Sequence, residues 1–375
     1  MSKEICIVSE NYPSEGDPGF SFVQQLAFCL SNEGFKCSII APQSITKALV
    51  RGEKIRRKKT VDISPEQKRI NVYRPLVITF SNTKNSWLIN IASFFYEKAI
   101  SSTLKKNKNI GTVYCYFWHM GLITAKAIQR TSQKLIVQAS ECSISVDSAY
   151  ATKENINRVN GVVCASRKNY DESLEWGLIN YNSRTAIIPN GYREDEFFHI
   201  DKAVAREKMG FDNSIFIVAF VGGFNERKGT RRLSDAIDNF TDVYSIFIGR
   251  GNEEPTCKNI LFQGTVEHNR LCDYLNCADL FVLPTKAEGC CNAIIEAIAC
   301  GVPVISSNKS FNDEILDDSY SIRIDENNVA EITKAISVLK NNEQLREQMS
   351  RNALKAAKEF EISKRAKAIA QFINY

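Results

Sequence analysis

Short apolar runs alternate along the chain with segments of helical periodicity. In the clearest case the apolar run 280–283 precedes a loop, a helical pattern with isoleucines across 294–298, and a second apolar run at 302–305. We expect Asn292 to cap this helix and Gly301 to end it. Strand, loop, helix and strand in this order form the βαβ unit of a parallel sheet.

The beginning of the chain shows the same order of elements. An apolar run at 5–8 precedes a loop rich in Gly, Pro, Asp and Ser at 11–20, a helical pattern at 22–32 and an apolar run at 37–40. This second βαβ unit lacks the Gly-x-Gly-x-x-Gly turn of dinucleotide-binding folds, which disfavours an NAD-linked oxidoreductase.

The remaining pattern extends this alternation to the end of the chain. In the helix expected at 85–104, Leu88, Ile91, Phe94 and Phe95 share one face, which predicts burial in the core. The repeated alternation of strands and helices predicts an α/β protein with parallel sheets. Further strands are expected at 71–80, 112–117, 135–138, 161–165, 185–189, 215–221, 244–248 and 260–264, and further helices at 122–129, 329–360 and 363–373.

Length and composition narrow the class of protein. The 375 residues suggest two domains with substantial cores. The twelve cysteines include no Cys-x-x-Cys pair and are expected to be reduced and largely buried, as in a cytosolic protein. The predicted first strand argues against a signal peptide, and no apolar run approaches the roughly 20 residues of a membrane span. We expect a cytoplasmic protein, peripheral at the inner face of the plasma membrane if it meets a membrane.

Two carboxylates flank the start of the helix that follows residues 280–283. Glu288 lies just before this helix and Glu296 about one turn inside it. The loop faces the sheet edge where such folds bind ligands, and the free N–H groups of a helix start form an anion site. Carboxylates accept hydrogen bonds from sugar hydroxyls. The pattern therefore indicates a ligand whose phosphate is bound by backbone amides and whose two polyol groups are bound by the two glutamates. The alternative is that a glutamate here only stabilises the helix dipole.

The same residues carry a family resemblance. Glu-Gly-Cys-Cys-Asn-Ala-Ile-Ile-Glu-Ala from Glu288, followed by Ala-Cys-Gly-Val-Pro-Val from Ala299, resembles the signature of glycosyltransferase family 4, also called glycosyl transferases group 1. Members are retaining, nucleotide-sugar-dependent enzymes of the GT-B fold. The resemblance covers nearly the whole chain and is strongest over 221–314.

The resemblance implies two Rossmann-like, doubly wound domains facing across a cleft. Residues 1–188 are expected to form the N-terminal acceptor-binding domain, and residues 189–357 the nucleotide-sugar-binding domain. The C-terminal helix, 358–375, is expected to return to the first domain.

A second glycine turn supplies candidate phosphate ligands. Two cations beside a helix start suit a diphosphate. Lys228 matches the lysine of the family's glycine turn, whereas Gly223 stands where relatives often have an arginine, so Arg227 is expected to replace it. The resemblance implies that Glu288 contacts the donor sugar and that Glu296 contacts the ribose of the nucleotide. The catalytic candidates are Glu288, Lys228 and Arg227; the donor-binding set is Gly222, Gly223, Glu288, Gly289, Cys290, Cys291, Asn292 and Glu296.

Three residues are weaker candidates for the acceptor or the cleft. Gly19 is the nearest match to the family's glycine-containing loop after the first strand. His119 and Glu141 lie at strand ends, but the His-Gly pair that many relatives carry near here is missing. A purely structural histidine is the alternative at position 119.

The implied reaction moves a hexose from a nucleotide diphosphate sugar to a hydroxyl of a glycan or lipid-linked acceptor, with retention, in bacterial cell-surface polysaccharide biosynthesis. No Asp-x-Asp occurs, so the enzyme is expected to be metal-independent, and no cofactor is expected beyond the donor substrate. No nucleic-acid partner is expected. The alternatives are a GT-B nucleotide-sugar epimerase and a non-catalytic subunit that binds sugar nucleotides.

A strongly basic stretch, residues 47–69, is the last feature. Its nine cations and three acids give it a net charge of +6, against +5 for the whole chain. It is either a solvated loop or a surface for anionic membranes, worth about 1 kcal/mol per basic residue near the lipid. The cations are Lys47, Arg51, Lys54, Arg56, Arg57, Lys58, Lys59, Lys68 and Arg69, and the acids are Glu53, Asp62 and Glu66.

Overall fold

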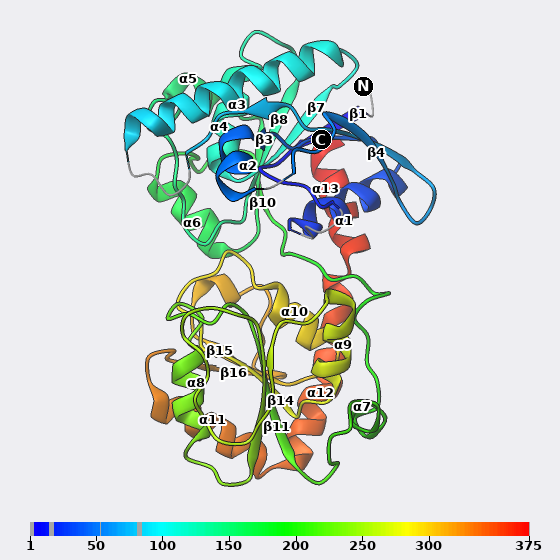
Figure 1. The fold of residues 1–375 in the computed structure, drawn as a ribbon, viewed down its shortest axis with the longest axis vertical. Helices are drawn as coiled ribbons and strands as arrows, with labels where there is room; N and C mark the ends of the chain where they lie inside the picture. Colours follow the sequence, from blue (N-terminus) through cyan, green and yellow to red (C-terminus); the bar gives the residue numbers. More distant parts are fainter. Residues whose placement is uncertain (1–3, 15–18, 53, 81–84, 375) are drawn as a thin grey trace. The chain divides into compact units, whose positions relative to one another are not determined.

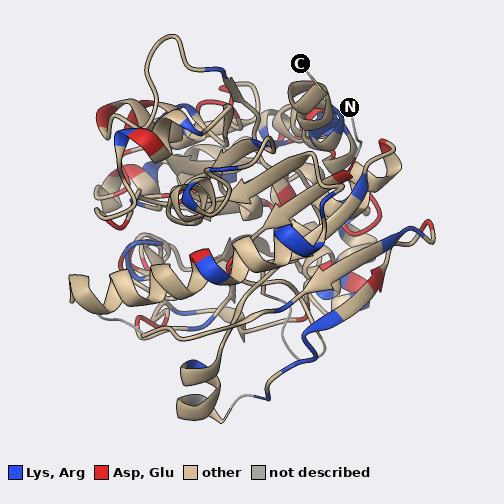
Figure 2. Ribbon diagram, turned by 90° about the horizontal axis from the view of Figure 1, so that it is seen from above, with Lys and Arg blue, Asp and Glu red and all other residues tan. Residues whose placement is uncertain are grey.

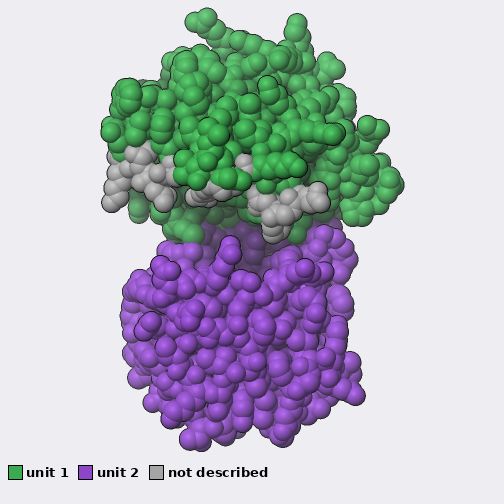
Figure 3. Space-filling model, viewed as in Figure 1, with its two compact units in different colours: residues 1–188, 365–375 green, residues 189–364 purple. Residues whose placement is uncertain are grey.

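The computed structural model describes residues 4–14, 19–52, 54–80 and 85–374 and shows an α/β protein (Figure 1). Its contacts divide the chain into two compact units (Figure 3). Unit 1 comprises Met1–Ile188 and Arg365–Tyr375, and unit 2 comprises Pro189–Lys364. Each unit has its own parallel sheet, as the alternating pattern predicts.

In the described part of unit 1, eight strands form one sheet in the order β10-β9-β8-β7-β1-β2-β5-β4. All neighbours are parallel except β4, an antiparallel edge strand. β1 lies between β2 and β7, so the chain winds outward in both directions from β1. The strands are β1 (Glu4–Val8), β2 (Lys36–Ile40), β4 (Lys59–Ile63), β5 (Arg69–Tyr73), β7 (Thr112–Tyr116), β8 (Lys134–Ala139), β9 (Gly161–Cys164) and β10 (Thr185–Ile187); β3 (Gln43–Ser44) and β6 (Leu76–Val77) pair separately.

Helices cover both faces of this sheet because successive strand residues point to opposite sides. Ile5 and Ile7 of β1 join a core cluster with α1 (Ser21–Asn32) and the end of α13 (Ile362–Asn374). Cys6 and Val8 join the cluster of the other face, with α3 (Ser86–Lys106) and α4 (Trp118–Ala127). The unit also contains α2 (Ile45–Arg51), α5 (Lys153–Asn157) and α6 (Arg167–Glu175).

Unit 2 is built on a fully parallel sheet of order β13-β12-β11-β14-β15-β16. Helices α8 and α11 lie on one face, and α9, α10 and α12 on the other (Figure 1). The strands are β11 (Phe216–Val221), β12 (Val243–Ile248), β13 (Ile260–Gly264), β14 (Leu280–Leu283), β15 (Val304–Ser307) and β16 (Ser321–Ile324). The helices are α7 (Lys202–Met209), α8 (Thr230–Ile237), α9 (His268–Asn276), α10 (Asn292–Ala299), α11 (Val329–Lys340) and α12 (Glu343–Ala357), with 3₁₀ turns at Ser310–Asn312 and Lys358–Phe360.

A buried ion pair ties the entry of unit 2 to its sheet. The Arg206 side chain is 2% exposed and donates to Asp279 at 2.7 Å and to the carbonyl of Cys277 at 2.9 Å. Asp279 also accepts from the backbone N–H of Ile217 at 2.8 Å. Paired in this way, the guanidinium is buried without an uncompensated charge.

Two local expectations were wrong. The face of α3 expected in the core is not buried, because Phe94 is 48% exposed and Leu88, Ile91 and Phe95 are only half-buried. The core contacts of α3 come from its later residues, such as Ile100 and Leu104, which pack on the sheet. Asn292 is the first residue of α10 rather than its cap, since Cys291 holds the cap position.

The basic stretch 47–69 is not a plain loop. It contains most of α2 and all of β4, and Lys and Arg residues mark the segment between them (Figure 2). Glu53 lies outside the described residues. Residues 71–80 also differ from the single strand expected, because Pro75 separates β5 from β6.

Among the described helices, none combines the length and the apolar character needed to cross a bilayer.

Candidate active site

The predicted donor residues of unit 2 lie on two loops at the centre of its sheet. β11 and β14 are neighbours, although β12 and β13 come between them in sequence. The sheet therefore changes winding direction between β11 and β14, and ligands of such sheets bind at the carboxyl edge of this position. The loop 222–229 follows β11, and the loop 284–291 follows β14.

Glycine lets these two loops touch backbone to backbone. Gly229 has φ +79°, a conformation that side chains with a Cβ rarely adopt. A Cβ at this position would overlap the carbonyl oxygen of Pro284. Arg232 reinforces the contact by donating to the same Pro284 oxygen at 2.9 Å. The start of α8 is thus fixed against the end of β14.

Three donors converge on one oxygen of Glu288. Lys228 Nζ lies 2.7 Å, Arg227 Nη1 2.9 Å and Thr285 Oγ1 2.7 Å from Glu288 Oε1. Glu288 is 7% exposed. Because the partners come from both loops, the structure brings together all three catalytic candidates, and Thr285 joins them.

Lys228 is held at this point from both ends. Its backbone N–H donates to Asn225 Oδ1 at 3.0 Å, and its ammonium group is largely buried beside Glu288. Burial lowers the pKa of Lys228, but Cys291 and Glu288 together raise it more, so the net shift is upward. The lysine is therefore a fixed cation at neutral pH.

Residues 289–291 lead into α10 beside this cluster, and Asn292 is the first residue of the helix. Gly289, Cys290 and Cys291 are buried, and burial raises the pKa of the Cys291 thiol to about 11. Asn292 Oδ1 accepts from Asn190 Nδ2 at 2.8 Å, and the same amide donates to the Cys290 carbonyl at 3.2 Å. A protonated thiol is a poor nucleophile, so Cys291 acts here as a small buried side chain.

Glu296 lies one turn inside α10. Burial raises the pKa of its carboxyl group to about 8; Glu196 adds to the shift and Lys228 opposes it. The carboxyl group makes no hydrogen bond with the described residues, although Glu296 is buried. Buried polar groups are normally hydrogen-bonded, so this carboxyl is available to a ligand hydroxyl.

Gly222 and Gly223 begin the loop after β11. A Cβ on Gly222 would press against the Lys228 side chain, and one on Gly223 against the amide of Asn225. Both glycines thus leave room for the residues that position the cation. No arginine stands at position 223, and Arg227 is the second cation that reaches Glu288.

The weaker candidates all belong to unit 1. Gly19 follows β1, His119 lies at the start of α4 after β7, and Glu141 follows β8. β1, β7 and β8 are consecutive in the sheet, so the three residues share its carboxyl edge. Burial raises the pKa of Glu141, although the backbone N–H groups of Trp118 and Ser140 oppose this, and burial lowers the pKa of His119.

Sequence reasoning missed several residues at these edges. Phe20 and Phe117 have φ of +66° and +70° on the unit 1 edge, and their rings meet edge to face with centroids 6.3 Å apart. Phenylalanine gives no signal for such a backbone, and strain of this kind gathers at functional sites. Thr285 in unit 2 was also missed; its only signal was its place two residues beyond a strand end.

Known proteins share this architecture. Residues 201–356 match the model of the family described as glycosyl transferases group 1. The chain is 28% identical over 326 residues to a protein described as a putative teichuronic acid biosynthesis glycosyltransferase, TuaC, of Bacillus subtilis, and the match covers 81% of each chain.

Two solved structures have the same fold. Sucrose-phosphate synthase from Thermosynechococcus elongatus matches with a TM-score of 0.78 at 16% identity, over 99% of this chain and 98% of that one. Anabaena Alr3699/HepE, solved in complex with UDP, matches with a TM-score of 0.72 at 14% identity, over 99% of both chains. The fold is therefore GT-B, and residues 201–356 of the chain match the glycosyl transferases group 1.

Proposed function

We propose that this glycosyltransferase moves a hexose from a nucleotide diphosphate sugar to a hydroxyl of a glycan or lipid-linked acceptor, with retention of anomeric configuration. The observation that carries the donor assignment is the convergence of Lys228, Arg227 and Thr285 on Glu288 at the switch point of unit 2. Cations, amides and a carboxylate at one sheet edge suit a ligand that carries both phosphates and hydroxyls.

In this proposal the two cations stabilise the leaving diphosphate. An ammonium group has three N–H donors and a guanidinium five, so Lys228 and Arg227 keep donors for phosphate oxygens beside those given to Glu288. Fixed cations that face a developing negative charge need no reorganisation during the reaction. Lys228 meets this condition because Asn225 and Glu288 hold its two ends.

The two glutamates take the polyol parts of the donor. Glu288 would accept from hexose hydroxyls through the oxygen that does not bind the cations. Glu296 has a buried carboxyl without a hydrogen bond to the described residues, which supports a ribose hydroxyl as its partner. Without a nucleophile in the proposed mechanism, the diphosphate itself assists deprotonation of the acceptor.

The acceptor is assigned to unit 1 and the process to bacterial cell-surface polysaccharide assembly. Gly19, His119 and Glu141 share the ligand edge of the unit 1 sheet. The description of TuaC as a teichuronic acid biosynthesis glycosyltransferase supports the polysaccharide assignment.

A transfer assay tests the proposal. UDP-hexoses are the first donors to try, because the Anabaena neighbour is described in complex with UDP. A thermal-shift screen of nucleotide sugars comes first, since a ligand at 100 times its Kd adds about 2.7 kcal/mol to stability. Transfer should survive EDTA. Free sugar products formed without acceptor would indicate the epimerase, and donor binding without turnover would indicate the partner subunit.

We further propose that residues 47–69 bring the enzyme to an anionic membrane surface. Exposed apolar side chains lie among the exposed cations: Leu49 is 76% and Val50 86% exposed on α2. On the edge strand β4, Val61 and Ile63 are exposed on the same face as Lys59. Apolar side chains interleaved with cations suit an anionic lipid interface better than open water.

A further inference from the structure

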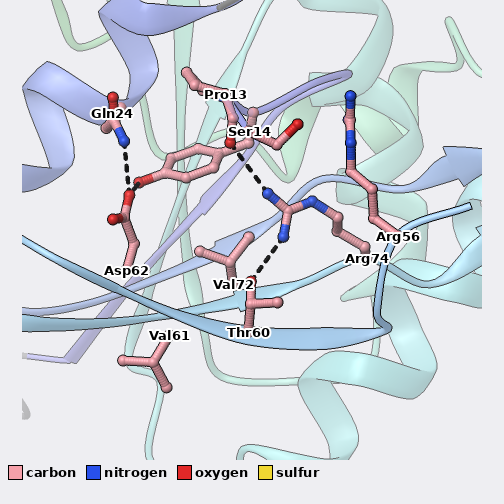
Figure 4. A pocket seen from close by; sticks show the side chains of 10 residues that line it. Pro13, Ser14, Gln24, Arg56, Thr60, Val61, Asp62, Val72 and Arg74 are labelled. Atoms are coloured by element: carbon pink, nitrogen blue, oxygen red, sulfur yellow. Dashed lines mark hydrogen bonds between the residues drawn. The ribbon is translucent and has the colours of Figure 1, made fainter. Parts of the chain in front are cut away.

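Unit 1 contains a pocket of about 590 Å³ between the loop after β1 and the neighbouring strands β4 and β5 (Figure 4). Two arginines, Arg56 and Arg74, line it together with Ser14, Thr60 and Asp62. Arg74 directly follows β5, and Ser14 lies in the loop after β1. Both strands run in the same direction, so the pocket lies on the carboxyl edge that also carries Gly19, His119 and Glu141.

Arg74 is a buried cation that forms no ion pair with a carboxylate among the described residues. The residue is 5% exposed, and its guanidinium donates to Thr60 Oγ1 at 2.8 Å and to the Pro13 carbonyl at 3.2 Å. The Tyr12 ring lies 5.8 Å away as a weak further partner. Arg206 in unit 2 is equally buried but has the carboxylate of Asp279 at 2.7 Å.

Asp62 does not fill this role. Its Oδ2 accepts from Tyr12 Oη and from Gln24 Nε2, both at 2.7 Å, on the side of the pocket away from the Arg74 guanidinium (Figure 4). Burial lowers the pKa of Arg74 and the charge of Arg56 lowers it further, while Tyr12 and Asp62 oppose this. The described lining residues of the pocket carry two guanidinium groups and one carboxylate.

The pocket also holds unused hydrogen-bonding capacity. Ser14 Oγ is buried and has no hydrogen-bond partner among the described residues. Thr60 Oγ1 accepts from Arg74, so its own O–H proton remains free to be donated. Arg74 uses two of its five N–H donors on Thr60 and Pro13. Val72 supplies apolar lining beside these groups.

We propose that this pocket binds a phosphate group carried by the acceptor, an inference that rests on the proposed transfer to an acceptor held by unit 1. Guanidinium forks match phosphate oxygens in pairs. A single fork satisfies a carboxylate, whereas this pocket offers two arginines and two hydroxyls, enough for the several oxygens of a phosphate. The apolar lining takes the organic part of the molecule that carries the phosphate.

Calorimetry on the full chain tests the pocket with a hexose 1-phosphate and, as control, the unphosphorylated hexose. The Lys228→Ala background weakens competing phosphate binding in unit 2. In that background the hexose 1-phosphate should bind and the hexose should not. Arg56→Gln should weaken binding about tenfold or more, as expected for one lost hydrogen bond to a charged group, and Ser14→Ala several-fold.

Arg57→Gln is the matched control, because Arg57 is the exposed neighbour of Arg56 and carries the same charge. It should leave the affinity within about twofold. Arg74→Lys keeps the charge of the buried residue but removes the fork, and it should bind as weakly as Arg56→Gln. If the Arg74→Lys variant does not fold, the Arg56→Gln and Ser14→Ala variants still test the proposed phosphate site. Equal effects of Arg56→Gln and Arg57→Gln would overturn the pocket, as would equal binding of hexose and hexose phosphate.

Two further comparisons separate the sources of the phosphate. If phosphatidylcholine vesicles that contain phosphatidic acid displace the hexose 1-phosphate, and Ser14→Ala weakens vesicle binding, the phosphate belongs to a lipid. If the vesicles do not compete, it belongs to a soluble acceptor. The proposed transfer reaction fails separately, through absence of turnover with every donor while phosphate binding in unit 1 persists.

Discussion

At the scale of single residues, Glu288 joins the two loops of the unit 2 switch point. Its Oε1 receives the donors of Lys228, Arg227 and Thr285, so its removal leaves Lys228 buried beside Arg227 without a counter-charge. Glu288→Ala should nearly abolish transfer, with a loss of at least about 10²-fold in kcat. It should also cost about 3–5 kcal/mol of stability, as for a broken buried ion pair.

Steady-state kinetics and denaturant unfolding of Glu288→Ala give the two values separately. Glu288→Gln keeps the size and one acceptor oxygen, so it should recover part of the stability and little of the turnover. Wild-type activity in the alanine variant would refute the assignment of Glu288 to the donor site.

Lys228 and Arg227 are predicted to bind the diphosphate. Lys228→Ala should lose about 1.5–3 kcal/mol of nucleoside diphosphate binding, the range for a hydrogen bond to a charged group. Arg227→Ala should lose a similar amount if Arg227 replaces the arginine missing at Gly223. Arg231→Ala is the control, because Arg231 is exposed on the neighbouring helix α8. Unchanged calorimetric affinity in both test variants would contradict the phosphate assignment.

Glu296 makes stability depend on pH in a defined window. Its pKa is about 8 in the folded protein and about 4.5 as an ordinary glutamate, so unfolding releases its proton between these values. Its contribution to stability is fully present below about pH 4.5 and is lost as pH rises towards 8. Glu296→Gln cannot ionise, and its unfolding free energy should fall less over this window than that of the wild type. Parallel pH profiles from urea titrations would show that Glu296 does not titrate there.

Residues whose placement depends on neighbouring sequence could be predicted, whereas residues whose contacts come from distant parts of the chain could not. Glu288 and Glu296 could be predicted as a pair because both are local to one helix start, and their contact with the donor stays a prediction. Thr285 was not, because its role comes from an oxygen that Lys228 and Arg227 approach from another strand. The cap expected at Asn292 failed for the same reason: its side chain is engaged by Asn190, about 100 residues away in sequence.

At the scale of elements, the site depends on how tightly the start of α8 packs against the end of β14. Gly229 and Gly210 have nearly equal φ, +79° and +73°, but only Gly229 faces the Pro284 oxygen, whereas nothing lies near Gly210. Gly210→Ala should therefore cost only backbone strain, about 1 kcal/mol. Gly229→Ala should cost clearly more and weaken donor binding as well. Thermal unfolding and calorimetry of this pair check the argument, and equal losses would show that the loop contact is unimportant.

Buried elements with a clear hydrophobic pattern could be predicted, whereas elements that are partly buried and partly exposed could not. β11, β14 and α10 are buried on several sides, so their apolar runs matched the structure within about two residues. The first half of α3 has the same apolar spacing but leaves Phe94 and Trp87 exposed, because periodicity does not tell what a face packs against. β4 escaped notice because an edge strand with cations on its outer face resembles a polar loop.

At the scale of the whole molecule, residues 47–69 are predicted to bind the protein to an anionic membrane. The protein should bind anionic but not neutral liposomes, and binding should fall with salt because the Debye length is only about 8 Å near physiological ionic strength. Changing Arg57, Lys58 and Lys59 to Ser should remove most of the binding and leave donor affinity unchanged. Arg56 is left in place because it lines the unit 1 pocket.

Liposome sedimentation measures this prediction, and two further variants sharpen it. Leu49→Ser with Val50→Ser should weaken binding without changing its dependence on salt, because these exposed side chains carry no charge. Serine at three exposed lysines of unit 2 should have little effect; these are Lys334, Lys355 and Lys358. If the wild-type protein does not bind anionic liposomes at low salt, the proposed membrane binding is wrong.

The return of the last residues to unit 1 has a consequence for how the chain is made. Along the sequence, unit 2 is an insertion whose two ends are joined by backbone hydrogen bonds, from Tyr192 N to Phe360 O at 2.9 Å and from Ile362 N to Tyr192 O at 2.8 Å. Unit 1 needs Ala366 and Ile369 to complete the core beneath α1. During synthesis, residues 1–188 therefore emerge before α13, and the part of the sheet face that α13 covers stays exposed until this helix leaves the ribosome.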